Sequence, residues 1–389
     1  MVNINDIKIS ELAGYSFDCN CGKSHQVDIR KISIGSQVYR EIPEIIKEYK
    51  GKKIFIIADS NTNEIYGEKV YQTLKNESFI LERHIFETKQ NLIPNEEAIG
   101  RLTVEIEKDV AMIIAVGSGT INDISRIISY KLDIPYIIVG TAPSMDGYAS
   151  TVSPLIINGF KKTYGAVYPY AILADMDIIK QAPTEMICAG FGDILGKYTA
   201  LTDWKLSKVI NNEYYCENCV QMVECAIKKC VDNAQGIAAR DSQSISYLME
   251  ALILSGIVMG MVGNSRPASG AEHHLAHYWE ISALAKGIEH PLHGNSVGVG
   301  TVIISKIYEI VSKKYDIGFE IPDPKNIIEL LKSAGCCYDP KLLGIDREVF
   351  RSSILHAKEI RPRYTVLHLA QELELLECAA DELTDFYYK

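Results

Sequence analysis

Five of the nine histidines in this 389-residue chain fall within 21 residues, at spacings suited to binding a metal. His273 and His277 are four residues apart, so they lie on one face of a helix, and such a pair is a common metal-binding arrangement. The H-E-x-x-H pattern of zinc proteases is not met, because Glu272 precedes the pair and His274 occupies the position of the glutamate. The segment 290–294, HPLHG, adds two histidines at a predicted helix–loop–helix junction, where a further ligand could close the site.

A carboxylate that could bind the same ion stands in GFGDILGKYTA, residues 190–200. Asp193 is flanked there by large apolar residues, in a helix that otherwise has the pattern of a buried element. An unpaired buried charge is costly, so we expect Asp193 to face a cation. Three protein ligands with one open position are typical of a catalytic metal site. Spacing alone leaves open whether His273 or His274 is the ligand.

A glycine-rich turn follows the most apolar strand pattern of the chain. It consists of Gly117, Ser118, Gly119 and Thr120. Glycines at such a turn let the backbone approach a ligand, and the N–H groups of the following helix attract a phosphate. Asn122 stands where the usual dinucleotide fingerprint has its third glycine, and no Walker lysine follows. A tight turn without a ligand therefore remains an alternative.

Other polar residues follow strands of the same predicted sheet. After the next strand come Thr141, Ala142, Pro143, Ser144, Asp146 and Ser150. Ligands of parallel sheets bind at the carboxyl ends of the strands, so these residues are candidates for cofactor contacts. Asp59 ends an earlier strand, where its carboxylate could accept hydrogen bonds from a ribose diol and would repel a 2′-phosphate, which favours NAD. A helix N-cap is an equally good interpretation of Asp59.

The elements that position these residues differ between the two halves of the chain. Apolar strand patterns at 52–59, 81–88, 109–116 and 134–140 alternate with helical patterns at 95–108 and 121–132. This alternation predicts an α/β domain over residues 1–180, with a parallel sheet covered on both faces. From Pro183 onward the patterns are helical, at 184–210, 213–236, 244–263, 270–284 and 295–314, and they predict an all-helical domain over residues 181–389.

Composition excludes several classes of protein. Forty basic against fifty acidic residues give a formal charge of −10, which disfavours nucleic-acid wrapping and binding to an anionic membrane. The strongly apolar uncharged stretch 251–265 is too short to span a bilayer. The first twelve residues lack the pattern of a signal peptide. Ten scattered cysteines form no disulfide framework, so we expect a cytoplasmic protein.

Two groups of cysteines are weaker metal candidates. Cys19, Cys21 and His25 could bind a metal, but the segment offers no fourth ligand, and a tight turn or hairpin is favoured. Cys216 and Cys219 fall in a helical pattern without a partner pair, and we expect them to belong to a packed helix face.

Several motifs together resemble a known family. GSGTINDISR, TAPSMDGYAS, GFGDILGKYTA, SRPASGAEHHLAHYWE and HPLHGNSVGVG resemble the sn-glycerol-1-phosphate dehydrogenases, within the iron-type alcohol dehydrogenase and dehydroquinate-synthase superfamily. The resemblance covers nearly the whole chain, and the opening DCNCGKSH is similar to the bacterial branch. It implies a Rossmann-like domain, a helical domain and an active site in the cleft between them.

The resemblance also implies an activity and the residues that perform it. The activity is reversible reduction of dihydroxyacetone phosphate to sn-glycerol 1-phosphate by NAD(H) or NADP(H), in a homo-oligomer that we expect to be a homodimer. Asp193, His273 and His293 would bind one divalent metal ion, zinc or nickel, between which the ligand types do not discriminate. Asp146 and His277 would contact substrate. The cofactor would be held by Gly117 to Ile121, Thr141 to Ser144, and Ser150.

The remaining predictions concern the proton, the substrate phosphate and the alternatives. A proton would reach the alkoxide through His277 or a water, and Arg266, or else Lys197, would bind the phosphate. The alternatives are a glycerol dehydrogenase, a cyclase of the dehydroquinate-synthase type and a non-catalytic nucleotide-binding regulator. The complete set of Asp193, His273, His277 and His293 argues against the regulator.

Overall fold

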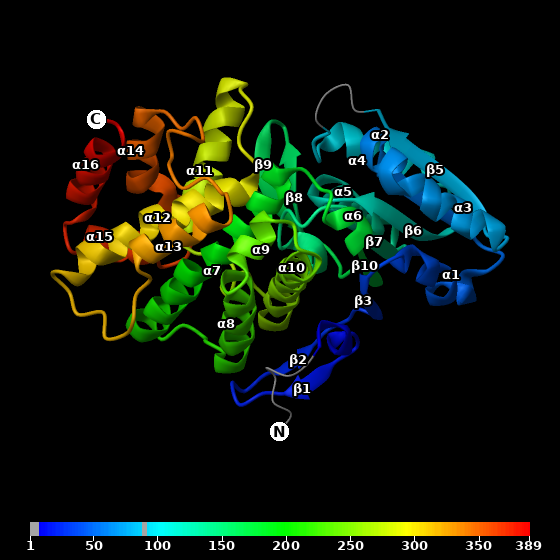
Figure 1. Cartoon of the computed structure of the whole chain (residues 1–389), viewed down its shortest axis with the longest axis horizontal. Coiled ribbons are helices and arrows are strands. Elements are labelled where there is room, and N and C mark those ends of the chain that lie inside the picture. Colours follow the sequence, from blue (N-terminus) through cyan, green and yellow to red (C-terminus); the bar gives the residue numbers. More distant parts are fainter. Residues whose placement is uncertain (1–7, 88–91) are drawn as a thin grey trace.

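The computed structural model describes residues 8–87 and 92–389, and its first half is built on a six-stranded sheet (Figure 1). The sheet has the order β3-β10-β7-β6-β4-β5, and all its strands are parallel. The strands are β3 (Lys31–Gly35), β4 (Lys53–Asp59), β5 (Ile80–Phe86), β6 (Val110–Gly117), β7 (Tyr136–Gly140) and β10 (Ala171–Asp175). The predicted α/β class is confirmed. The predicted end of the second strand at residue 88 lies outside the described residues.

The strand order reverses between β4 and β6, at the carboxyl edge of the sheet. From β4 the chain passes to β5 on one side and then returns to β6 on the other. Ligands of such sheets bind where the strand order reverses. Asp59 at the end of β4 and the turn after β6 both lie at that point. The helical elements of this half are η2 (Ile9–Leu12), η3 (Val38–Glu41), α1 (Ile42–Ile45), η4 (Lys47–Tyr49), α2 (Ser60–Thr62), η5 (Asn63–Gly67), α3 (Glu68–Asn76), α4 (Glu96–Glu105), α5 (Gly119–Leu132) and η6 (Gly147–Ala149).

The second half is helical, as predicted, and within the described residues after Asp175 no strand is formed. Its helices are α6 (Met176–Ile179), α7 (Thr184–Asn211), α8 (Glu217–Val231), α9 (Ala234–Ala238), α10 (Ser242–Val262), α11 (Ala271–Lys286), α12 (His293–Ser312), α13 (Pro324–Ser333), α14 (Arg347–His356), η7 (Ala357–Ile360), α15 (Val366–Glu372) and α16 (Leu376–Tyr387). The single helix predicted over 213–236 is two helices, α8 and α9. The division into two domains near residue 180 remains a prediction.

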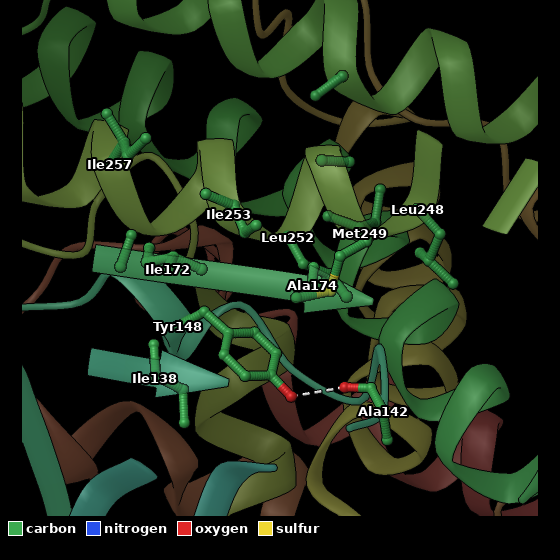
Figure 2. Close-up of a cluster of buried hydrophobic side chains, with 14 of the residues drawn as sticks. Ile138, Ala142, Tyr148, Ile172, Ala174, Leu248, Met249, Leu252, Ile253 and Ile257 are labelled. Carbon is green, nitrogen blue, oxygen red and sulfur yellow. Dashed lines mark hydrogen bonds between the residues drawn. The ribbon is translucent and has the colours of Figure 1, made fainter. Parts of the chain in front are cut away.

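The largest core cluster joins the two halves, because α10 packs on one face of the sheet (Figure 2). Ile253 of α10 lies over Ile172 of β10, and both belong to this cluster. The buried Tyr148 lies beside Ile138 of β7 and donates a hydrogen bond to the Ala142 carbonyl at 2.5 Å. By length and composition α10 could cross a membrane, but 67% of its most apolar window is buried, as in a core helix.

Two antiparallel hairpins flank the sheet, and the one at residues 152–165 was not predicted. β8 (Val152–Ile157) pairs with β9 (Phe160–Gly165). Near the N-terminus, β1 (Ser16–Asp18) pairs with β2 (Ser24–Gln26), which agrees with the hairpin favoured for residues 19–25. This hairpin lies at the lower edge of Figure 1, below α8 and α10.

Candidate active site

Glycines allow three helices of the second half to approach closely enough to bring the predicted metal ligands together. A Cβ on Gly192 of α7 would lie 2.3 Å from the carbonyl oxygen of Gly294, in the first turn of α12. A Cβ on Gly300 of α12 would lie 2.8 Å from the carbonyl oxygen of Glu272 on α11. Larger residues would force these helices apart, and with them Asp193, His273 and His293.

Asp193 is fully buried and surrounded by positive groups and hydrogen-bond donors. Its Oδ1 lies 2.7 Å from Lys197 Nζ and 3.5 Å from His273 Nε2. Its Oδ2 accepts a hydrogen bond from the backbone N–H of Asp146 at 2.9 Å. Burial raises the pKa of this carboxyl, but the charge of Lys197 and the hydrogen bond with His273 outweigh burial, so the pKa is lowered. Asp193 is therefore ionised, as a metal ligand must be.

His273 is oriented by Glu272, a residue that the sequence analysis did not assign to the site. Its Nδ1 lies 2.7 Å from Glu272 Oε1, so Nε2 is the nitrogen that faces Asp193. A carboxylate that holds the second ring nitrogen is typical of histidines that bind metals. Burial lowers the pKa of His273, but its contacts with Asp193 and Glu272 outweigh burial and raise it. His274 lies deeper, with both ring nitrogens buried and unpaired among the described residues. The orientation of the rings therefore favours His273 over His274.

His293 lies next to His273, and it also belongs to a second group of possible ligands with His277 and Glu280. Its ring centroid lies 5.2 Å from that of His273 and 5.0 Å from that of His277. Its Nδ1 is buried and makes no hydrogen bond within the described residues, with Glu280 Oε2 at 3.6 Å. The ligand atoms of His277, Glu280 and His293 all lie within 4.8 Å of one another, so they form an alternative donor set. Glu280 was not predicted.

The donor chemistry fits a divalent ion at Asp193, His273 and His293. Oxygen and imidazole nitrogen are suitable ligands for zinc and nickel. The ligand atoms of these three residues do not all lie within 4.8 Å of one another, and the unpaired nitrogen of His293, Nδ1, is the one 3.6 Å from Glu280 Oε2. Glu280 is less available, because both its oxygens pair with Lys161 Nζ, at 2.7 and 2.9 Å. Lys161 comes from the β9 strand and was also missed.

Lys197 and Asp146 form a buried ion pair next to Asp193. Lys197 Nζ lies 2.8 Å from Asp146 Oδ2, and Ser255 donates to the same oxygen at 2.9 Å. Burial lowers the pKa of Lys197, but the charges of Asp146 and Asp193 outweigh burial and raise it. Lys197 is thus a fully buried cation between two carboxylates. This differs from the expectation that it binds the substrate phosphate.

Arg266, the first choice for the phosphate ligand, is also neutralised by the protein. Its side chain is only 3% exposed, and its guanidinium forms two hydrogen bonds with the Glu213 carboxylate and one with the Tyr364 carbonyl.

Two other arginines have fewer charged partners than Arg266. Among the described residues, Arg361 and Arg363 have no carboxylate within ion-pair distance. Arg361 contacts His277 Nε2 at 3.1 Å and two serine hydroxyls, and Arg363 donates to the Ser269 carbonyl at 3.3 Å.

The glycine-rich turn lies where a dinucleotide phosphate is expected. It leads from β6 into α5, whose N-cap, Ser118, makes no side-chain hydrogen bond to the first turn. The N–H groups there can receive an anion. A Cβ on Gly117 would lie 2.6 Å from the side chain of Ile121, which is itself buried in the core. Gly117 is therefore needed for packing of the helix on the strand, and Ile121 supports the turn.

The neighbouring loop is held against this turn. The backbone N–H of Thr141 donates to the Gly117 carbonyl at 3.1 Å. Tyr148 holds Ala142, and Arg126 donates to the carbonyl of Gly147. The remaining loop residues of the prediction, Pro143, Ser144 and Ser150, lie on the same segment. Ser150 is buried and hydrogen-bonded to the backbone of Val152.

Asp59 takes the structural role that the sequence left open. Its Oδ1 accepts a hydrogen bond from the N–H of Thr62 at 2.9 Å, and the hydroxyl of Thr62 accepts from the N–H of Asp59. This is a reciprocal helix cap. A contact between Asp59 and a ribose remains a prediction.

Comparison with known proteins first defines the class. A profile described as iron-containing alcohol dehydrogenase matches residues 33–183. The fold is that of a glycerol dehydrogenase from Schizosaccharomyces pombe, with a TM-score of 0.70 and 18% identity over 91% of this chain and 90% of that one. A sulfoacetaldehyde reductase from Bifidobacterium kashiwanohense, solved with NAD+, gives a TM-score of 0.69 and 15% identity over 91% of this chain and 96% of that one.

Sequence relatives narrow the class to one branch. A glycerol-1-phosphate dehydrogenase [NAD(P)+] from Halalkalibacterium halodurans is 36% identical over 381 residues, 91% of this chain and 96% of the relative. Relatives with the same description from Geobacillus thermodenitrificans and Pyrococcus horikoshii are 35% and 33% identical, over 95% and 87% of this chain and 99% and 92% of theirs. The chain belongs to the glycerol-1-phosphate dehydrogenase family of iron-containing alcohol dehydrogenases.

Proposed function

We propose that this chain is an NAD(P)H-dependent sn-glycerol-1-phosphate dehydrogenase that reversibly reduces dihydroxyacetone phosphate. The observation that carries the proposal is the buried group of Asp193, His273 and His293 beside Arg361 and Arg363, for which the described residues place no carboxylate within ion-pair distance. The first feature suits a catalytic divalent ion, and the second suits a phosphorylated substrate. The two candidate domains, divided near residue 180, would supply the cofactor turn and this group respectively.

Asp193, His273 and His293 would hold the metal. A divalent ion bound there would supply Lewis-acid polarisation of the substrate carbonyl, and zinc and nickel both suit the ligands. Glu272 keeps His273 Nε2 directed at Asp193. Lys197 limits the negative charge that Asp193 and Asp146 place in one buried pocket. Its ammonium therefore tunes the electrostatics of the site and is not expected to contact the phosphate.

His277 is suited to carry a proton to or from the substrate oxygen. Burial lowers its pKa well below the usual range, so the ring is neutral near neutral pH. Its Nδ1–H faces Glu280 Oε2 at 3.1 Å, and its Nε2 accepts from Arg361 at 3.1 Å. Arg361 can release Nε2 when a phosphate takes over the guanidinium. The turn 117–120 and the loop 141–150 would hold the dinucleotide, whose reduced nicotinamide supplies the hydride.

We assign the substrate phosphate to Arg361 and Arg363. Burial and the neighbouring positive charges lower the pKa of Arg363 to about 10, and burial also lowers that of Arg361. The protein thus keeps two half-buried cations close together at an energetic cost, which an anion would relieve. Ser265 and Ser269, at 3.3 and 3.4 Å from Arg361 Nη1, offer hydroxyl donors beside them.

The activity is tested by following NADH and NADPH oxidation with dihydroxyacetone phosphate, with chiral analysis of the product. We expect turnover to need added Zn²⁺ or Ni²⁺ after treatment with a chelator, and the product to be sn-glycerol 1-phosphate. Reduction of dihydroxyacetone without reduction of its phosphate would instead identify a glycerol dehydrogenase. Release of phosphate without a net change in NADH would identify a cyclase.

The phosphate assignment is tested separately with Arg361→Gln. Loss of one charged hydrogen bond costs about 1.5–3 kcal/mol, so KM for dihydroxyacetone phosphate should rise roughly 10- to 100-fold. KM for unphosphorylated dihydroxyacetone and for NADH should stay unchanged. Arg351→Gln is the matched control, because the Arg351 side chain is 43% exposed on α14 and, within the described residues, its ion pair is with Asp381 at 2.7 Å. Equal effects on both substrates would contradict the assignment.

We also propose a cytoplasmic location and a homodimer. All ten cysteines are free thiols in the structure, which suits a reducing compartment. Size-exclusion chromatography with light scattering tests the dimer.

A further inference from the structure

A second group of potential metal ligands lies at the N-terminal hairpin, and the proposed activity does not use it. Cys19 and Cys21 lie in the turn between β1 and β2, His25 lies on β2, and Cys216 is the N-cap residue of α8. One ligand atom from each of these four residues lies within 4.8 Å of all the others. The group joins segments that are nearly 200 residues apart in the sequence.

The separations between the ligand atoms match a tetrahedral metal site. Zinc bonds of about 2.3 Å to sulfur and about 2.0 Å to nitrogen give edges of roughly 3.8 Å between two sulfurs and roughly 3.5 Å between sulfur and nitrogen. The Cys19 and Cys216 sulfurs lie 3.6 Å apart. His25 Nε2 lies 3.3 Å from the Cys21 sulfur and 3.4 Å from the Cys216 sulfur.

Neighbouring groups orient the ligands, as they do around structural metals. His25 is fully buried, and its Nδ1 lies 2.8 Å from the carbonyl oxygen of Met261 at the end of α10. That contact makes Nδ1 the donor and leaves the lone pair of Nε2 directed at the three sulfurs. Asn218 Nδ2 donates to the Cys19 sulfur at 3.2 Å. The Tyr214 hydroxyl lies 3.1 Å from the Cys21 sulfur.

The hairpin also needs a source of stability that its own strands do not provide. β1 and β2 have three residues each, and an isolated two-stranded hairpin is at best marginally stable in water. His25 is the buried residue of β2. A link to the N-cap of α8 and the end of α10 would fasten this segment to the helical half.

We propose that Cys19, Cys21, His25 and Cys216 bind a structural Zn²⁺ ion. Four protein ligands leave no open coordination position, so the ion is not expected to meet substrate. Cys219, whose sulfur lies 4.0 Å from His25 Nε2, stays outside the tetrahedron and hydrogen-bonds to Cys216. The site is independent of the proposed activity, since none of its ligands belongs to the active-site group.

The first test uses the unaltered protein. After equilibration with Zn²⁺ and desalting, metal analysis should give two equivalents per chain. An organomercurial, which blocks thiolates, should release one of them to a colorimetric chelator. Cobalt-substituted protein should show a sulfur-to-cobalt charge-transfer band and the intense visible bands of tetrahedral cobalt. A cobalt protein with no charge-transfer band, or no mercurial-released zinc, would overturn the proposal.

The second test assigns the ligands. Cys19→Ser and Cys216→Ser should each lose one equivalent of zinc and the charge-transfer band, while Asp193→Asn should lose the other equivalent and keep the band. Cys378→Ser is the matched control, because that thiol is exposed on α16. Should the first two variants fail to fold, the cobalt spectrum of the Asp193→Asn protein decides alone. A Cys19–Cys216 disulfide in freshly purified, zinc-free protein would refute the site.

Discussion

Replacing Gly190 by alanine tests whether close packing between α7 and the cofactor loop is needed for catalysis. Gly190 lies three residues before Asp193 on α7. A Cβ there would lie 1.8 Å from the carbonyl oxygen of Pro143 and 3.1 Å from Leu252 Cδ1. The first neighbour is backbone and cannot turn aside. The helix and the loop at residues 141–144 must therefore separate.

The size of the effect follows from that contact. Contacts of a Cβ closer than 3.0 Å essentially never occur, so the two segments must move apart by roughly 1 Å or more. Overpacking of this kind costs about 1–3 kcal/mol of stability. A misplacement of about 1 Å between reacting groups can lower the rate roughly 100-fold. We expect Gly190→Ala to fold with a lower Tm and to lose kcat/KM by about that factor.

The assay combines thermal unfolding, steady-state NADH oxidation with dihydroxyacetone phosphate, and metal content. Gly100→Ala is the matched control, because Gly100 sits within α4 and, apart from the backbone of that helix and the adjacent residues, no described atom lies within 4 Å of a Cβ added there. That change should stabilise the protein by up to about 1 kcal/mol and leave kcat/KM unaltered. A Gly190→Ala protein with the Tm and kcat/KM of the wild type would refute the packing argument.

Three further predictions concern buried charges. Burial raises the pKa of Asp203 from 3.8 to about 7, so the protonated carboxyl contributes up to about 4 kcal/mol of stability at acid pH, and this contribution is lost as the pH rises through about 7. The unfolding free energy of Asp203→Asn should therefore improve relative to that of the wild type as the pH rises over this range. A difference between the two proteins that stays constant with pH would contradict this prediction. Arg266→Met should lose roughly 2–4 kcal/mol of stability, because Glu213 loses its ion-pair partner. The KM for dihydroxyacetone phosphate should stay unchanged in this variant. A raised KM without a loss of stability would instead identify Arg266 as the phosphate ligand. Asp193→Asn should lose one equivalent of bound metal while Glu280→Gln keeps it, and the opposite result would move the ion to the alternative donor set.

Most of the sheet was predictable, and one hairpin was missed despite a local signal. Strands β4, β6 and β7 are buried on both faces, and continuous apolar runs identify such strands. The β8–β9 hairpin turns at Asn158 and Gly159, both with positive φ, at 53° and 76°. Asn-Gly between two strand patterns is a strong hairpin signal, and it would have located this hairpin. Lys161, which neutralises Glu280, lies on β9.

The predictable part of the active site is the part that helical spacing encodes. His273 and His277 share a face of α11, and their rings lie 6.3 Å apart. Asp193 was identified because a carboxylate in an apolar helix needs a cation. Arg361 follows η7, more than 80 residues after His277. No periodicity links such distant residues, so only tertiary packing brings that guanidinium to the imidazole.

Distance along the sequence also explains why the fourth ligand of the cysteine site was not predicted. Within residues 19–25 the sequence offers three ligands, and the search for a fourth in the same segment fails. The fourth ligand of the proposed site is Cys216, which was assigned to a packed helix face because its own helical pattern lacks a partner pair of cysteines. Cys216 is fully buried, but it stands at the N-cap of α8, where the chain enters the helix and the side chain can point along the helix end toward the hairpin. A residue at the end of a helix can contact both the helix and the segment beyond it, and the periodicity of the helix alone predicts only the first contact.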